Sequence, residues 1–490
     1  MNKRILFFFI SLFAGVSVAG QSISLFPGNS HYLLYHGKPT VLVTSAEHYG
    51  AVLNADFDFE KYLQTLHEDG MNYTRIFSGS YVEIPGSFSI RNNSLAPAVG
   101  SFLAPWKRTD EPGLFKEEKK FDLSTFNPAY FERLKIFITR AEELGVMVEV
   151  TLFCSTYRDE IWERNPFNPG NNINIPENLD RKKSNTLENG NLTGFQKKMV
   201  EKIVTELNDF DNVFYEIQNE PWADDPQKAM RTLRTLEPQP GQGGWFKWAE
   251  MASEASLKWQ KEMATTIVQT ESALPKKHLI AQNFSNFKYS VSKVDPNISI
   301  MNFHYVWPEA VWLNYGWNRP VSFDESGFAG SDDKTYLRQA WQFMLAGGAI
   351  FNNLDYSFYV GKENGTGENN APGGGSANLR KQLKRLHDFM NTFEFVKMQP
   401  DFTVVTHSPG LEWQAISEPG KQYAIIFNGS PVRWIKLNLP KGKYHFECFS
   451  PVSGRPLKKG FFTKDEKGIM RFDLPQFDDL MVMKIVKKAT

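Results

Sequence analysis

The feature that most constrains the fold is an alternation of short apolar segments with amphipathic helical patterns between about residues 38 and 390. Short apolar runs rich in β-branched residues are typical of strands that are buried on both faces. Strands that alternate with helices predict parallel pairing, because each helix returns the chain to the same edge of the sheet. The eight predicted strands are residues 39–44, 71–77, 146–153, 213–218, 278–282, 298–303, 320–324 and 349–354.

The segments between these strands carry helix signals. Residues 56–69 place four apolar side chains on one face, and Asn127 before Pro128 is typical of a helix start. The pattern predicts an α/β fold of the (β/α)8 TIM-barrel type. A doubly wound open sheet is the competitor, and the lack of a glycine-rich loop after the first strand argues against it. The predicted helices are residues 56–69, 127–145, 194–207, 245–272, 332–346 and 378–393.

The pattern changes after about residue 400, where short alternating runs follow one another without helices. Asn428-Gly429 lies between two of these runs and predicts a hairpin. The sequence therefore predicts a small all-β sandwich over residues 396–490, after a barrel domain over residues 21–395. We expect the sandwich to pack on the barrel as a stabilising module. The predicted strands are residues 402–406, 411–416, 423–427, 434–439, 443–449, 469–474 and 480–486.

The first twenty residues have the pattern of a signal peptide. Lys3 and Arg4 precede an apolar run over residues 5–18, and small residues lead to an expected cleavage site before Gln21. This predicts export across the inner membrane, to the periplasm or the extracellular medium. No later stretch is long and apolar enough to predict membrane insertion.

Charge and composition narrow the classes of function. The chain has 55 basic and 55 acidic residues and no basic stripe, which argues against nucleic acid as a partner. Its nine histidines show no metal-binding spacing, so a metallohydrolase is disfavoured and no metal is expected. Cys154 and Cys448 fall in different predicted domains and are expected to be buried free thiols.

Two glutamates at the ends of predicted strands carry the chemistry. Glu220 follows the fourth strand within Asn-Glu-Pro, and Glu325 follows the seventh within Asp-Glu-Ser-Gly. In a parallel barrel the carboxyl ends of all strands meet at one mouth, so these two side chains should converge. Two carboxyl groups that flank one bond are the requirement of glycoside hydrolysis. The pair therefore predicts a glycosidase acting on an oligo- or polysaccharide.

These segments also resemble a known family. Residues 215–221 (Tyr-Glu-Ile-Gln-Asn-Glu-Pro) and 321–327 (Val-Ser-Phe-Asp-Glu-Ser-Gly) resemble the acid/base and nucleophile motifs of the clan A glycoside hydrolases. The resemblance extends to Arg75 and to residues 302–305, and is strongest to family-5-like secreted bacterial enzymes with an appended β-sandwich. It implies a retaining double-displacement mechanism without a cofactor.

The resemblance also implies roles for individual residues. Glu220 is the expected general acid/base and Glu325 the expected nucleophile, with their carboxyl groups at the short separation of about 5–5.5 Å that retaining enzymes show. Asn219 is expected to bind the sugar hydroxyl next to the anomeric carbon. Arg75 is expected to keep Glu325 ionised. His304 or Tyr305 is expected to touch one of the two carboxylates.

Other positions at the predicted mouth are weaker candidates for substrate binding. Glu47 and His48 follow the first strand, where a structural hydrogen-bond role is the equal alternative. Trp222 and Trp307 are candidate walls of sugar subsites, and Asn353 ends the eighth strand. Long predicted loops favour a closed pocket and short or branched substrates.

Rival classes of function stay open. A carbohydrate-binding surface protein without catalysis would keep the aromatic side chains but has no need of both carboxylates. A structural or adhesive protein would leave the barrel unexplained. The sugar, the linkage, the choice between chain ends and internal bonds, and the oligomeric state are not predicted.

Overall fold

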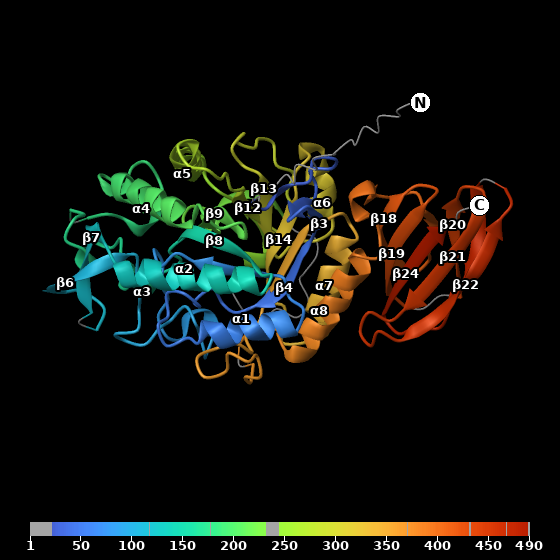
Figure 1. Ribbon diagram of the computed structural model, residues 1–490, viewed down its shortest axis with the longest axis horizontal. Coiled ribbons are helices and arrows are strands. Elements are labelled where there is room, and N and C mark those ends of the chain that lie inside the picture. Colours follow the sequence, from blue (N-terminus) through green and yellow to red (C-terminus); the bar gives the residue numbers. More distant parts are fainter. Residues whose placement is uncertain are drawn as a thin grey trace, which may run out of the picture.

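The structure, a computed structural model, describes residues 22–116, 118–176, 178–231, 245–369, 371–430, 433–466 and 468–488. The predicted signal peptide therefore lies outside the described residues. Figure 1 shows two parts side by side: a barrel with surrounding helices, and a set of strands beyond helices α7 and α8. Within the described ranges, no helix is both long and apolar enough to cross a membrane.

The predicted TIM barrel is confirmed. Eight parallel strands follow one another around the barrel in the order β4-β15-β14-β13-β12-β9-β8-β5. Their bounds are β4 Leu42–Ala46, β5 Tyr73–Phe77, β8 Met147–Cys154, β9 Val213–Asn219, β12 Ile280–Asn286, β13 Ile300–His304, β14 Val321–Ser326 and β15 Ile350–Leu354.

A side chain completes the ring between the first and second barrel strands. β4 and β5 are the two ends of the hydrogen-bonded series of described strands. Across this seam the Asn72 carboxamide accepts from the Val43 amide and donates to the Val41 carbonyl, both at 2.9 Å. The carboxamide thus satisfies backbone groups that a strand ladder would otherwise pair.

Helices surround the barrel as predicted. The Asn127 side chain caps α2 by accepting from the Ala129 amide, and the Asp332 side chain caps α7 by accepting from the Lys334 amide. The helices are α1 Phe59–Glu68, α2 Pro128–Glu143, α3 Asp159–Trp162, α4 Leu192–Leu207, α5 Glu254–Ser272, α6 Glu309–Asn314, α7 Asp333–Met344 and α8 Ala377–Met390.

The helix predicted over residues 245–272 is wrong in its first part. There the chain forms β11 (Trp248–Met251), which pairs antiparallel with β10 (Gln227–Arg231) and meets the edge of β12. The helix begins only after Ser253, whose hydroxyl accepts from the Ser256 amide. Pairing with a neighbouring edge outweighs the local helical period, and the serine cap supplies the true start.

A long insertion follows β5. It occupies residues 78–127 and contains the hairpin of β6 (Trp106–Pro112) and β7 (Lys119–Phe126), at the far end of the barrel from the sandwich (Figure 1). The strand predicted over residues 39–44 is two strands. Its first part is β3 (Lys38–Thr40), which joins a small N-terminal sheet with β1 (Ser24–Leu25) and β2 (Leu33–Tyr35).

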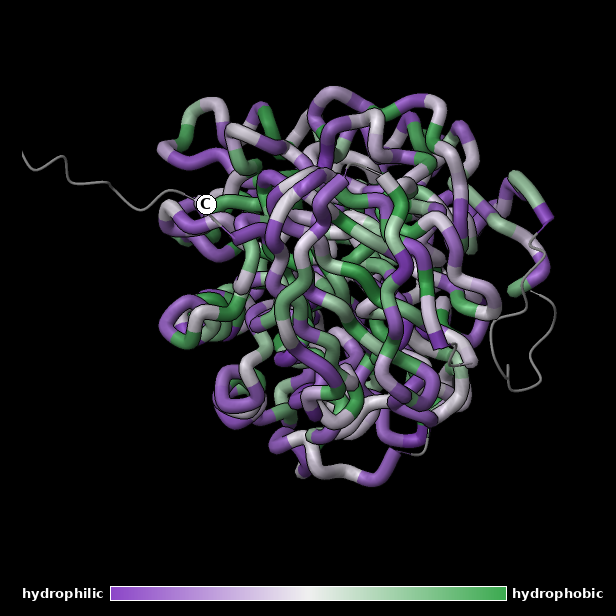
Figure 2. Tube along the Cα trace, turned by 90° about the vertical axis from the view of Figure 1, so that its right-hand side faces the viewer, coloured by the Kyte–Doolittle hydropathy of each residue, from purple (hydrophilic) through white to green (hydrophobic). Residues whose placement is uncertain are grey.

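The C-terminal part is the predicted β-sandwich. One sheet has the order β16-β18-β19-β24-β21-β22 and the other the order β17-β20-β23. In the view of Figure 2, onto the sandwich end, hydrophilic residues predominate in the loops at the edge of the projection. The strands are β16 Gln399–Pro400, β17 Val405–His407, β18 Leu411–Glu418, β19 Gln422–Gly429, β20 Trp434–Leu439, β21 Gly442–Phe449, β22 Pro456–Lys464, β23 Gly468–Asp473 and β24 Leu480–Lys487.

The hairpin predicted at Asn428-Gly429 is wrong. β19 and β20 lie in different sheets, so the chain crosses from one sheet to the other after Gly429. The backbone of Gly429 has a φ of 131°, and a Cβ there would lie 2.5 Å from the Gly410 carbonyl oxygen. The glycine therefore permits a close approach between two segments of the backbone, at residues 410 and 429, and does not form a two-residue turn.

The sandwich packs on the barrel helices through apolar side chains. Trp341 of α7 and Phe389 of α8 contact Phe449 of β21, with ring centroids 5.9 and 5.5 Å apart. Ile416 and Val482, on the facing sheet, belong to the same buried cluster as the barrel core. One continuous apolar core therefore joins the two parts.

Candidate active site

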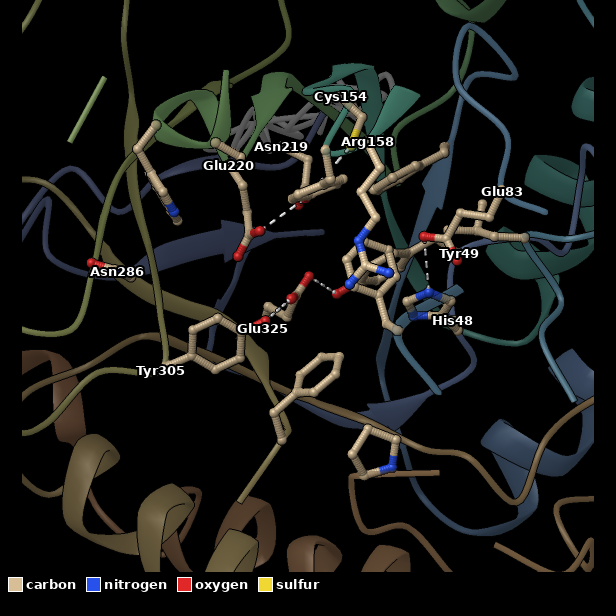
Figure 3. Close-up of a pocket in the computed structure, with 18 of the residues that line it drawn as sticks. His48, Tyr49, Glu83, Cys154, Arg158, Asn219, Glu220, Asn286, Tyr305 and Glu325 are labelled. Carbon is tan, nitrogen blue, oxygen red and sulfur yellow. Dashed lines mark hydrogen bonds and ion pairs between the residues drawn. The ribbon is translucent and has the colours of Figure 1, made fainter. Parts of the chain in front are cut away.

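The carboxyl ends of the barrel strands meet around a cavity of about 310 Å³ (Figure 3). β9 contributes Asn219 and the following Glu220, and β14 contributes Glu325. Tyr305 follows β13, and His48 follows β4. The convergence predicted from strand-end positions is therefore present in the structure.

Strained backbone shapes this mouth. Residues other than glycine adopt a left-handed backbone directly after β9 and β13 and a few positions after β4 and β14, and their side chains line the cavity. Such a conformation costs roughly 1 kcal/mol or more at each position and persists only where the surrounding structure enforces it. These residues, with their φ angles, are Tyr49 (61°), Glu220 (46°), Tyr305 (54°) and Phe328 (56°).

The two strand-end glutamates face each other. One carboxylate oxygen of Glu220, one of Glu325 and a ring nitrogen of His304 all lie within 4.8 Å of one another. Figure 3 shows the two carboxylates pointing into the same space. This separation is as short as the roughly 5–5.5 Å expected between the carboxyl groups of a retaining pair. It is well below the roughly 6.5–9.5 Å that leaves room for a water between them.

Glu325 is surrounded by donors and cations. The Tyr49 hydroxyl donates to Oε2 at 2.8 Å, the Tyr305 hydroxyl donates to Oε1, and Nη1 of Arg75 lies 3.4 Å from Oε2. Burial favours the neutral acid and is the largest single effect on the pKa of Glu325. The positive charges of His304 and Arg75 and the two tyrosine hydroxyls outweigh it and lower the pKa. Glu325 is therefore held as an anion.

Glu220 has a different environment. Its Oε1 lies 2.9 Å from Nδ1 of His304, and its Oε2 accepts from the Tyr157 hydroxyl at 2.8 Å. The Asn219 carboxamide donates to the same tyrosine oxygen at 2.8 Å, which fixes the tyrosine between the two side chains. Two carboxyl groups in unlike environments are the arrangement that separates an acid from a nucleophile.

His304 links the two carboxylates. Besides its contact with Glu220, Nδ1 lies 3.6 Å from Glu325, and Nε2 lies 3.4 Å from Asp324. Burial disfavours the charged ring and is the largest effect, but the charges of Glu325 and Asp324 prevail and raise the pKa of His304. The imidazole is thus held as a cation between these carboxylates.

A buried polar layer beneath the mouth holds Arg75. Its Nη2 donates to Glu216 and, at 2.7 Å, to the Asn219 side-chain oxygen, and its Nε donates to Thr151 at 3.0 Å. The guanidinium therefore has one orientation, with Nη1 directed at Glu325. Arg75 and Glu216 have no exposed side-chain surface, so their pairing acts without solvent screening.

This layer retains a proton. The Asn302 amide nitrogen lies 2.7, 2.9 and 3.2 Å from Glu149, Glu216 and Asp324, but carries only two hydrogens. Burial, and then the charges of Glu216 and Asp324, raise the pKa of Glu149 well above its usual range. Burial and these charges therefore favour the neutral form of Glu149.

Two sets of side chains in the described part of the chain approach the spacing of metal ligands. One is Glu216, His304 and Asp324, and the other is Glu220, His304 and Glu325. A metal requires neutral imidazole, whereas the pKa of His304 is raised, and the Arg75 guanidinium already donates to Glu216. The residues present fit a network of ion pairs better than metal ligation.

The structure distributes the predicted site residues over two layers. Asn219, Trp222, His48 and Tyr305 line the cavity with the two glutamates. Arg75 and His304 lie directly beneath, in contact with those glutamates. The Trp222 ring stands edge-on to the His304 ring, with centroids 5.6 Å apart.

Three predicted substrate contacts are not supported. The Glu47 carboxylate is used inside the protein, where it accepts from the Gly50 and Ala51 amides and the Ser94 hydroxyl. Asn353 donates to Ser45 at 3.0 Å and does not line the cavity. These are structural roles, which a strand-end position alone does not distinguish from binding.

The predicted substrate contact of Trp307 is not supported either. Its ring stacks on Phe287 with centroids 5.5 Å apart, in a small apolar cluster that also contains Tyr305. It packs within the cluster that includes Tyr305 and does not line the cavity.

Sequence reasoning missed several residues that reach the site, among them Tyr49, Tyr157 and Glu83. Tyr49 follows the first barrel strand next to His48, so its position could have indicated it. Tyr157 lies in the loop after the third strand. Glu83 lines the cavity from the long insertion, and nothing in its local sequence marks it.

Comparisons with known proteins agree with the fold. No protein-family model matches the chain, and no curated protein matches it. A crystal structure from Bacteroides vulgatus ATCC 8482, assigned as a glycoside hydrolase, is similar with a TM-score of 0.66 at 13% identity, covering 97% of this chain and 84% of that one. A glycoside hydrolase family 5 structure from the same organism is similar with a TM-score of 0.59 at 12% identity, covering 95% and 94%. At these identities the likeness shows a common fold.

Proposed function

We propose that this protein is a retaining glycoside hydrolase acting on oligo- or polysaccharides, with Glu220 as general acid/base and Glu325 as nucleophile. The observation that carries the proposal is the convergence of the two carboxylates within 4.8 Å at the barrel mouth. The unlike environments of the two groups and the glycoside hydrolases of similar fold support it.

In the first step the Glu325 carboxylate attacks the anomeric carbon. The bond from that carbon to the leaving oxygen breaks, and Glu220 gives its proton to the departing oxygen. Glu325 is suited to this role because Tyr49, Tyr305 and Arg75 hold it ionised and aimed at the cavity.

In the second step water releases the sugar from Glu325. Glu220, now an anion, takes the proton of the attacking water, and the ester bond to Glu325 breaks. His304 contacts Glu220 at 2.9 Å and Glu325 at 3.6 Å, so the imidazole stays beside the charge as it moves between the two carboxylates. The proposal includes export, which rests on the pattern of residues 1–20.

The test is the stereochemistry of hydrolysis together with Glu325→Ala. Wild-type protein is screened on 4-nitrophenyl monoglycosides, and the first product anomer is followed by proton NMR. Retention is expected, together with loss of roughly 10⁴-fold or more in kcat for Glu325→Ala. An inverted first product would make Glu325 a base instead of a nucleophile. Undiminished hydrolysis by Glu325→Ala would reject the site.

A further inference from the structure

We propose that the cavity is closed on the side of the sugar that becomes bonded to Glu325, where the Glu83 carboxylate, paired with His48, binds a hydroxyl group of one terminal sugar unit. The protein would then remove single sugars from chain ends and short glycosides. This rests on the proposed function and adds to it the position of the bond that is cut.

The two catalytic carboxylates define the direction of the substrate. The general acid protonates the leaving group, so the leaving group lies on the side of Glu220. The sugar that is attacked lies toward Glu325, whose neighbour Tyr49 directly follows His48 in the chain. In Figure 3, His48 and Glu83 lie beyond Tyr49, on the side of the cavity away from Glu220.

His48 and Glu83 form a polar pair built into this end. Both line the cavity although only 8% of His48 and 2% of Glu83 are exposed, and His48 Nε2 lies 3.4 Å from Glu83 Oε1. The Glu83 carboxylate also accepts from the Tyr81 hydroxyl at 3.2 Å and from the Asn93 carboxamide. A carboxylate has about four lone-pair sites, so Glu83 can accept one further hydrogen bond from a ligand hydroxyl in the cavity.

The wall that carries Glu83 is fastened to the barrel. The Ser94 hydroxyl is shared between the Glu47 carboxylate and, at 3.0 Å, the His48 carbonyl. The backbone carbonyl of Ser94 accepts from the Asn54 carboxamide at 2.9 Å. A Cβ at Gly50 would lie 2.2 Å from the Ser94 backbone, so the two loops pass too closely for any larger residue. Glu47 is thus a positioning residue for this wall.

The arrangement leaves little room beyond the first sugar. Apolar side chains of the same insertion, Phe88 and Leu95, line the cavity next to Glu83, and Phe328 and Pro372 line it from other loops. The volume of about 310 Å³ is at the small end of ligand cavities. A polysaccharide passing through in both directions would need this wall to be absent.

The experiment measures where a chain is cut. Hexasaccharides of glucose, mannose, xylose and galactose, each labelled at the reducing end, are incubated with the enzyme, and labelled products are resolved by length over time. The expected first labelled product is one sugar shorter than the substrate. Labelled di- or trisaccharides as first products would overturn the proposal while leaving glycoside hydrolysis intact.

Variants test the recognition itself. Glu83→Gln and His48→Gln are expected to lower kcat/KM for the terminal cut by about 10- to 100-fold through weaker binding, the usual effect of losing a hydrogen bond to a charged group. Glu111→Gln, an exposed glutamate on the same insertion, is the matched control and should match wild type. Melting curves of all three variants separate lost binding from misfolding.

Two outcomes separate this inference from the proposed function. Wild-type kinetics in Glu83→Gln and His48→Gln, with chain-end products, would reject the assignment of the pair alone. Hydrolysis that persists in Glu325→Ala, or no hydrolysis of any glycoside by wild type, would reject the proposed function and this inference with it.

Discussion

The mouth of the barrel and the junction between barrel and sandwich are built from different kinds of side chain. At the mouth, Glu220, Glu325, His304 and Arg75 are buried ionisable groups that form a chain of contacts, next to strained backbone. At the junction, aromatic and aliphatic side chains of α7 and α8 meet the sheet of the sandwich in a single apolar core.

The difference shows which region contributes most to the stability of the fold and which region serves activity. Apolar burial contributes free energy of folding in proportion to area, whereas buried ion pairs barely offset their desolvation. We therefore expect changes at the mouth to alter activity with little loss of stability, and changes at the junction to do the reverse.

The largest expected effect is at the mouth. Glu220→Ala should lower kcat by about 10²- to 10⁴-fold on oligosaccharides, because the departing oxygen then leaves without a proton. On glycosides with an acidic phenol as leaving group, the loss in the first step should be much smaller. The melting temperature should not fall. An equal loss on both substrate types would contradict the acid role.

The matching change at the junction is Trp341→Ala. The ring is fully buried between the barrel helix and Phe449, so the cavity should lower the free energy of unfolding by about 3–5 kcal/mol. Activity per folded molecule at low temperature should equal that of wild type. Thermal melts and assays on one preparation check both, and a lower kcat at unchanged stability would break the comparison.

A smaller effect is expected for Tyr49→Phe and Tyr305→Phe. Both hydroxyls donate to Glu325 and help to lower its pKa below the usual range, so their removal raises that pKa. Glu325 must be ionised to attack, so activity lost on acidification should be lost at higher pH than in wild type. About a tenfold loss of kcat/KM should accompany the shift. If the acidic side of the pH profile is unchanged in both variants, these hydroxyls do not help to keep Glu325 ionised.

The smallest expected effect is at the rim of the junction. Lys334 of the barrel pairs with Asp479 of the sandwich, but both side chains are about half exposed. Lys334→Ala should therefore change the free energy of unfolding by less than about 1 kcal/mol and leave activity unaltered. Chemical denaturation at low and high salt measures it. A loss as large as that of Trp341→Ala would mean that charge, not apolar burial, joins the two parts.

Much of the fold and part of the site could be predicted from the sequence. Buried parallel strands and capped helices have local signals, so the barrel strands and the caps at Asn127 and Asp332 were predictable. The positions of Glu220 and Glu325 at strand ends predicted that they meet. Local sequence is sufficient for this prediction, because strand order and strand direction bring the ends of all parallel strands to one mouth.

Other features depend on contacts between distant segments. The strand β11 exists because β10 and β12 are beside it, and Gly429 marks a crossing between sheets because of where Gly410 lies. Neither neighbour is visible in the local pattern, so propensity favoured a helix in one case and a hairpin in the other.

The sequence by itself determined the barrel, the sandwich and the meeting of two carboxylates, because short stretches of sequence show both the hydrophobic period and the position of a residue at a strand end. Only the tertiary structure decided which polar side chains serve the mouth and which serve the scaffold. Glu47 and His48 are adjacent in the chain, yet one carboxylate binds backbone amides while the other side chain faces the cavity. That choice depends on partners such as Ser94 and Glu83, which an insertion brings from further along the chain.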